Sequence, residues 1–155
     1  MLVAVAAGAT TSGNVIFGNA GGDGIGLSPN AQASVARGNL IVGNLGGVYF
    51  GGDAKTASRG NRVEENVVAR SRRFDVHSAY SPGAPVGSGN LVRRNCLWSP
   101  NATTAAGTGF TMRANRRIDP RLLRLRHRYV LAGSSPCKPA PPASGGTSVT
   151  DILFP

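Results

Sequence analysis

The sequence predicts an all-β protein whose chain winds into a parallel β-solenoid of about four to five turns. A short motif recurs at the spacing of solenoid turns, and apolar positions alternate with polar ones within it. The 155 residues also include 22 Gly and 10 Pro, which leave few windows long enough for a helix. We therefore expect one domain of short strands and bends.

The recurring motif is Gly-Asn, one variable residue, an aliphatic residue, two variable residues and a second Asn. Its copies are Gly13–Asn19, Gly38–Asn44, Gly60–Asn66 and Gly89–Asn95. This spacing is too short for a strand–helix crossover, but it suits a coil of short parallel strands stacked about 4.8 Å apart. The repeat therefore predicts one turn of the solenoid for each copy.

Stacked turns bring equivalent residues into contact. The aliphatic position of each copy is expected to face the core, and the two variable positions after it to lie toward solvent. The second Asn of each copy is expected to form a buried ladder in which the amides satisfy one another, with Asn19, Asn44, Asn66 and Asn95 in register. Asn tolerates the left-handed backbone of a sharp bend, and Gly serves the opposite bend.

The N-terminal segment reads as part of an earlier turn. Residues 2–5 are apolar enough for a strand, whereas residues 1–7 lack the basic region of a signal peptide. A solenoid end needs a polar cap, so we expect a fragment of a longer exported protein, whose exposed first turn offers an edge for self-association. No stretch approaches the roughly 20 apolar residues of a membrane span.

A second strand is expected in each turn. Its inward residues are predicted as two aligned sets: Ile25, Val48, Phe74 and Phe110, followed by Leu27, Phe50, Val76 and Met112. The segment Gly21–Leu27 has one poor match to a calcium-binding Gly-Asp repeat and is interpreted as a bend leading into a strand. Residues 113–128 hold seven Arg, one acid and interleaved leucines, and are expected to pack across the end of the stack.

The four motif copies, the run Asn115–Pro120 and the segment Tyr129–Cys137 together resemble the right-handed parallel β-helix, or pectin-lyase-like, superfamily, in its C-terminal portion. The resemblance covers about residues 13–137 and implies an exported protein. We divide the chain into β-helix turns and closing segment, residues 1–137, and a Pro/Gly/Ser-rich tail, residues 138–155. Leu153-Phe154-Pro155 departs from the family's ending, which leaves a complete C-terminal cap in question.

Enzymes of this superfamily need residues that are scarce in this chain. Its lyases use an Arg or Lys base, often with calcium held by carboxylates, and its hydrolases use several Asp, whereas this chain has only seven acids. Glu64 and Glu65 are expected to form ion pairs with Arg93 and Arg94 of the next turn rather than a catalytic site. No cofactor is therefore expected, and calcium only if the protein is a lyase.

The net charge is +10, and most of the 17 basic residues lie after residue 58. This charge fits an anionic partner, and it fits equally a GC-rich genome that favours Arg. Tyr49, Asp75, His77 and Arg113 are predicted to share one exposed face, where they would resemble a sugar-binding or acid–base site. The alternative is that they are scattered surface residues.

Three functions remain open from the sequence. We expect a non-catalytic segment of a secreted or cell-surface protein that binds or scaffolds acidic carbohydrate. The alternative is a fragment of a polysaccharide lyase or glycoside hydrolase. A nucleic-acid binder is disfavoured because no aromatic residues interleave with the Arg-rich segment. A Cys96–Cys137 disulfide is expected if the closing segment folds back near the last turn, as an exported protein can retain it.

Overall fold

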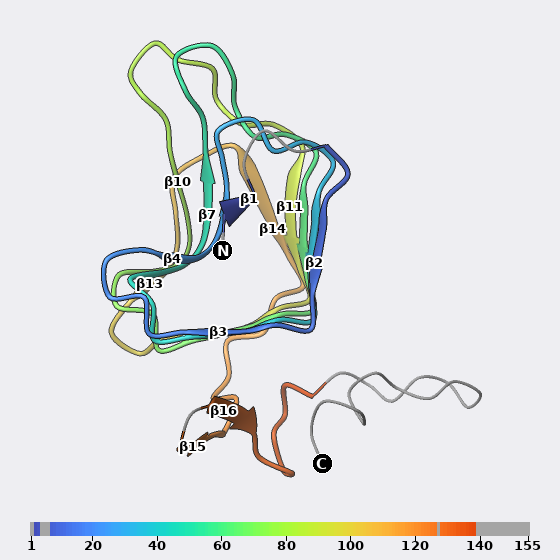
Figure 1. Ribbon diagram of the computed structural model, residues 1–155, viewed down its shortest axis with the longest axis vertical. Helices are drawn as coiled ribbons and strands as arrows, with labels where there is room; N and C mark the ends of the chain where they lie inside the picture. The colour runs from blue at the N-terminus through green and yellow to red at the C-terminus, as the bar shows by residue number, and fades with distance from the viewer. Residues whose placement is uncertain (1, 4–6, 127, 139–155) are drawn as a thin grey trace, which may run out of the picture.

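The computed structural model describes residues 2–3, 7–126 and 128–138, and all structural statements refer to these residues. The described residues form a parallel β-solenoid of about four turns and contain no helix. Viewed down the solenoid, three sheets enclose a three-sided interior (Figure 1). The prediction of an all-β solenoid is confirmed.

The strands of successive turns pair in parallel, and we number the three sheets after their first strands. Sheet 1 contains β1 (Leu2–Val3), β4 (Asp23–Leu27), β7 (Gly46–Gly51), β10 (Phe74–Ala79) and β13 (Thr103–Ala106). Sheet 2 contains β2 (Thr10–Ser12), β5 (Val35–Arg37), β8 (Arg62–Glu64), β11 (Asn90–Arg93) and β14 (Phe110–Arg113). Sheet 3 contains β3 (Val15–Phe17), β6 (Leu40–Val42), β9 (Val67–Ala69) and β12 (Cys96–Trp98).

The core contains an aliphatic column from each sheet. The central members of these columns are at most 1% exposed: Ile25, Val48 and Val76 from sheet 1, Ala36, Val63 and Val92 from sheet 2, and Ile41, Val68 and Leu97 from sheet 3. Phe74 is not level with Ile25 and Val48, because Val76 occupies that place. Phe110 and Met112 pair with β11 in sheet 2, so their predicted alignment with sheet 1 was wrong.

The asparagine ladder exists, but its register differs from the prediction. Asn19 stacks on Asn44 at the bend between sheets 3 and 1, whereas Asn66 stacks on Asn95 at the bend between sheets 2 and 3. The main ladder follows this second bend through Asn14, Asn39, Asn66, Asn95 and Asn115. The four predicted residues therefore form two separate pairs rather than one column.

The reason is that one motif serves two sides of the solenoid. Gly13–Asn19 and Gly38–Asn44 supply sheet 3, whereas Gly60–Asn66 and Gly89–Asn95 supply sheet 2. Both sides are a strand of three or four residues between two bends, so the same pattern fits either. Ladder neighbours are consequently 25, 27, 29 and 20 residues apart along the chain.

The left-handed residue at the main bend precedes the Asn rather than being the Asn. Gly13 and Gly38 hold this conformation in the first turns, with φ of 66° and 63°. Glu65, Arg94 and Ala114 hold it later, with φ of 58°, 54° and 52°. A glycine here is therefore favourable but not required, since the ladder hydrogen bonds hold the bend in non-glycine turns.

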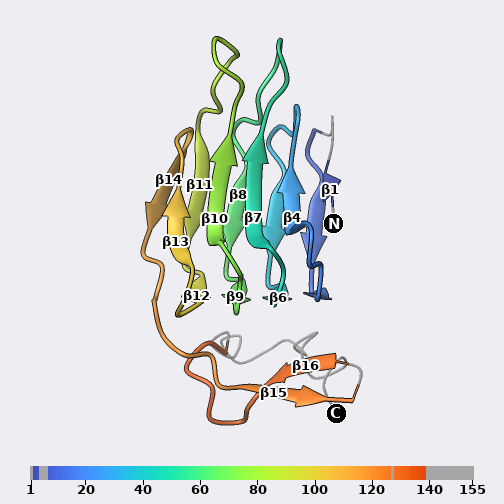
Figure 2. The ribbon, with the colours of Figure 1, turned by 90° about the vertical axis from the view of Figure 1, so that its left-hand side faces the viewer.

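An antiparallel hairpin, β15 (Leu122–Leu125) with β16 (Arg128–Leu131), follows the last turn. It lies against the outer face of sheet 3, below the solenoid in Figures 1 and 2. Leu122, Tyr129 and Leu131 pack there against Leu40, Val42 and Val67. The closing segment thus covers one side of the stack. The sequence-based expectation that it packs across the end of the stack was wrong.

No helix in the part of the chain that the structure describes is long and apolar enough to cross a membrane.

Candidate functional site

Sheet 1 offers its outer face to solvent, and Figure 2 looks onto it. Tyr49 of β7 and His77 of β10 are register partners there, with ring centroids 4.9 Å apart. Both face outward because Val48 and Val76, the residues before them, face the core. Two of the four predicted site residues therefore lie side by side.

The imidazole of His77 also meets a carboxylate that sequence reasoning assigned to a bend. His77 Nε2 lies 2.7 Å from Asp23 Oδ1, although β7 separates β4 from β10. Gly46 makes this contact possible, because a Cβ there would overlap the Asp23 carboxylate and lie 3.0 Å from His77 Nε2. The side chains are 18% and 24% exposed, so the pair is screened only partly by water.

Aromatic rings flank this histidine. Phe74 stacks on the His77 ring at 5.0 Å between centroids, with an interplanar angle of 24°. The exposed guanidinium of Arg73 lies over Phe74, 5.4 Å from its centroid. The Asp23–His77 pair is therefore bordered by Tyr49 on one side and by Phe74 with Arg73 on the other.

Tyr49 is held by its surroundings. Its hydroxyl donates to the carbonyl of Ala79 at 3.2 Å. Partial burial raises the pKa of the phenol, Asp23 adds to this, and a hydrogen bond with Ser28 acts in the opposite direction. The phenol therefore stays neutral at physiological pH and presents a hydrogen-bonding edge and a flat face.

Asp75 does not belong to the exposed face, contrary to the prediction. It is 1% exposed, and its carboxylate accepts a hydrogen bond from the Ser99 hydroxyl. Strict alternation fails at the start of β10 because Asp75 and Val76 are both buried. Burial raises the pKa of Asp75, while hydrogen bonds from Ser99 and Ser71 and the charge of Arg117 oppose the rise.

Arg113 lies on a different side of the solenoid. It ends β14 in sheet 2, where its register partner is Arg93. The prediction that it joins Tyr49 and His77 was wrong because β14 was assigned to the wrong sheet. Sequence reasoning missed Asp23, Phe74 and Arg73, although the closeness of Arg73 and Phe74 to His77 along the chain was a usable signal.

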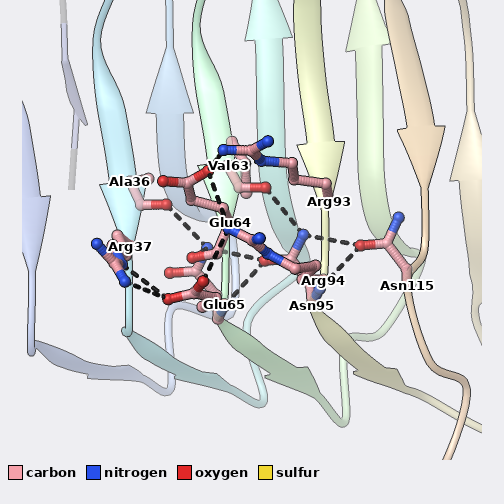
Figure 3. A network of polar contacts seen from close by, with 10 residues as sticks. Ala36, Arg37, Val63, Glu64, Glu65, Arg93, Arg94, Asn95 and Asn115 are labelled. Atoms are coloured by element: carbon pink, nitrogen blue, oxygen red, sulfur yellow. Dashed lines mark hydrogen bonds and ion pairs between the residues drawn. The ribbon is translucent and has the colours of Figure 1, made fainter. Parts of the chain in front are cut away.

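The outer face of sheet 2 carries the ion pairs that the sequence predicted between neighbouring turns (Figure 3). Arg93 contacts Glu64 at 2.7 Å, and Glu65 contacts both Arg37 at 2.7 Å and Arg94 at 2.9 Å. Burial alone would favour neutral Glu64, but the hydrogen bond and charge of Arg93 outweigh it and lower the pKa. These charges largely neutralise one another, which suits a structural role.

The outer face of sheet 3 is occupied by the closing hairpin. Phe17 packs edge to face on Tyr129 at 5.6 Å, and Arg70 lies over the same ring at 5.7 Å. Cys96 of β12 and Cys137 are joined by a disulfide with 5.8 Å between their Cα atoms. Sheet 1 is thus the side whose outer face combines aromatic rings, a carboxylate, an imidazole and a guanidinium that has no ion pair among the described residues.

Among the residues described here, no three His, Cys, Asp or Glu side chains gather as a set that could hold a metal. Within this part of the chain, Asp23 and His77 form a pair without a third such ligand. A scan against protein families matched none, and searches of the curated proteins and of the solved structures matched no protein and no structure.

Proposed function

We propose that the outer face of sheet 1 binds an acidic polysaccharide without turnover, in a protein exported to the cell surface or its surroundings. The observation that carries the proposal is the Asp23–His77 pair bordered by aromatic rings on neighbouring strands. Sugar rings are recognised by flat aromatic surfaces and by paired polar groups that bind hydroxyls. The face spans several turns, which suits an extended polymer.

Each residue has a defined role in this proposal. Tyr49 and Phe74 supply apolar surface for sugar rings, and the Asp23 carboxylate accepts hydrogen bonds from hydroxyls. Arg73 is exposed, and among the residues that the structure describes its guanidinium contacts the Phe74 ring and no carboxylate, so it can pair with a uronate carboxylate. His77 is positioned by Asp23 and by the two rings on either side.

The other two outer faces are less suited to a ligand. Arg37, Arg93 and Arg94 on the sheet 2 side are engaged with Glu64 and Glu65. The apolar face of sheet 3 is packed against the hairpin. Binding on sheet 1 would require neither an ion pair to break nor the hairpin to move.

Retention on polygalacturonate at low salt tests the proposal. Arg73→Gln should weaken binding about tenfold, because a charge-assisted hydrogen bond contributes about 1.5 kcal/mol or more. Tyr49→Ala should also weaken it, and salt should reduce it by screening. Arg37→Ala, on sheet 2, is the matched control and should bind normally. Equal loss in Arg37→Ala, or no retention of the unmodified protein, would show that the face is ordinary surface.

A catalytic role has one observation in its favour, the contact that orients the His77 imidazole toward Asp23. Such a pair can act as a general base. However, Asp23 is the one carboxylate on the described outer face of sheet 1, whereas most glycoside hydrolases use two. Release of unsaturated or reducing sugar ends, abolished in His77→Ala, would establish turnover and replace the binding proposal.

A further inference from the structure

The last turn of the solenoid exposes a strand edge. Strand β14 pairs with β11 on one side and with no other described strand. Met112 is half-buried there, whereas its register partner Val92 is fully buried. A hollow of about 300 Å³ opens at this end, with Leu97 and Met112 among its lining and Arg113, Arg116 and Arg117 around it.

The outer face of sheet 2 forms a charge column that ends on an unmatched cation. Arg37, Glu64, Arg93 and Arg113 are register neighbours in that order. Arg93 is paired with Glu64 at 2.7 Å. Arg113 is exposed, and its guanidinium makes no ion pair or hydrogen bond with any residue that the structure describes. Its register neighbour is a like charge, which is unfavourable unless an anion lies on its other side.

Among the described residues, the asparagine ladder ends at the same edge, and its last member has a backbone donor without an acceptor. Asn95 donates its backbone N–H and its Nδ2 to Asn115 Oδ1, both at 2.9 Å. Asn115 donates Nδ2 to the Val92 carbonyl at 2.9 Å and makes a weak contact with Met112 Sδ at 3.9 Å. Its backbone N–H has no acceptor among the described residues. The next position in the ladder therefore calls for a side-chain oxygen.

We propose that this edge binds an extended acidic peptide as a further parallel strand beside β14. An acidic side chain would lie against Arg113, and an Asn or Asp oxygen would accept from Asn115. An apolar side chain of the peptide, pointing into the hollow, would pack on Met112 and cover it. Main-chain hydrogen bonds to an open edge supply affinity in such strand addition, and the side chains supply specificity.

The third turn of this chain provides the pattern for such a peptide. Val63 is fully buried in the core, Glu64 pairs with Arg93, and Asn66 belongs to the ladder. A second copy of the chain fits less well. Its first turn places Ser12 in the charge column, and residues 7–19 contain no acid to meet Arg113. This proposal is independent of the polysaccharide face, which lies on sheet 1.

Fluorescence anisotropy with a labelled synthetic peptide of residues 60–68 and the full chain tests the proposal. We expect saturable binding at low salt that Arg113→Glu weakens at least tenfold. A peptide with Arg in place of Glu64 should bind Arg113→Glu better than it binds the unmodified chain. Arg59→Ala, which removes another exposed arginine, is the control and should leave binding unchanged.

Amide exchange separates strand addition from general charge attraction. Bound peptide should slow exchange at β14 and at the Asn115 N–H, and it should leave β2 at the other end of sheet 2 unaffected. Equal binding by Arg113→Glu, or no slowing at β14, would overturn the proposal. Concentration-dependent oligomers in sedimentation that the peptide cannot dissociate would assign the edge to a second copy instead.

Discussion

Asn66 accepts two hydrogen bonds from Asn39 through a single oxygen. The backbone N–H and the Nδ2 of Asn39 both lie 2.9 Å from Asn66 Oδ1. Asn66 repeats the arrangement toward Asn95, and its Nδ2 also donates to the Ala36 carbonyl at 3.0 Å. Each buried Asn of this ladder thus satisfies two turns at once, which makes it a structural link between them.

We expect Asn66→Leu to destabilise the protein by about 3 kcal/mol or more, because each buried polar group left unpaired costs about 1 to 3 kcal/mol. Asn44→Leu should cost less, about 1 to 3 kcal/mol in total. Asn44 accepts from the Asn19 N–H and donates to the Ile16 carbonyl, so fewer partners lose a bond. Urea melts of both variants measure the difference, and a neutral Asn66→Leu would contradict a buried ladder.

The contributions of two buried carboxyls, Asp75 and Glu64, to the free energy of unfolding should change with pH in opposite directions. The folded pKa of Asp75 is raised above its ordinary 3.8, chiefly by burial. The folded state therefore binds this proton more tightly, and stability falls as pH rises from 3.8 through the folded pKa. Asp75→Asn should remove that fall. The free energy of unfolding of the variant, relative to that of the unmodified protein, should therefore be higher at pH 7 than at pH 3.

Glu64 should give the reverse result. Despite burial, Arg93 lowers its folded pKa below the ordinary 4.5. Its contribution is therefore present above pH 4.5 and is lost as pH falls through the folded pKa. Glu64→Gln should cost stability at pH 7 and less in acid. Urea melts of both variants at the two pH values check the signs, and parallel pH profiles for the two variants would refute this assignment.

Reduction should loosen the closing hairpin before the solenoid. The disulfide closes a loop between Cys96 and Cys137, 41 residues apart, and such cross-links stabilise by about 2 to 4 kcal/mol. Reductant should lower the free energy of unfolding by that amount and speed amide exchange in β15 and β16. The double variant Cys96→Ala/Cys137→Ala should not respond to reductant. Two titratable thiols in the unreduced, unfolded protein would exclude the bridge.

The fold class could be predicted because its signals are local. Alternation of Val63 with exposed Arg62, and the recurrence of Asn at bends, are visible within a few residues. The register could not be predicted, because the same pattern fits sheet 2 and sheet 3 equally. Only the hydrogen bonds between turns show that Asn39, the first Asn of its motif, stacks on Asn66, the second Asn of another.

The candidate site was predicted in part for the same reason. Tyr49 and His77 follow core valines on equivalent strands, so alternation alone brings them to one face. Alternation fails at Asp75, where two consecutive residues are buried. Asp23 reaches His77 across Gly46, and this contact depends on three strands in register and on one missing side chain.

The lengthening of the first turns from 25 to 27 to 29 residues has a consequence for engineering. Sheets 2 and 3 keep short strands of nearly constant length, so the extra residues fall in sheet 1 and in the loops after β7 and β10, which project beyond the sheet in Figure 2. Surface loops tolerate added residues far better than paired strands do. Foreign loops grafted between Gly52 and Ala57, or between Tyr80 and Ser88, should therefore leave the solenoid intact. They should change the shape of the protein surface next to Tyr49 and His77.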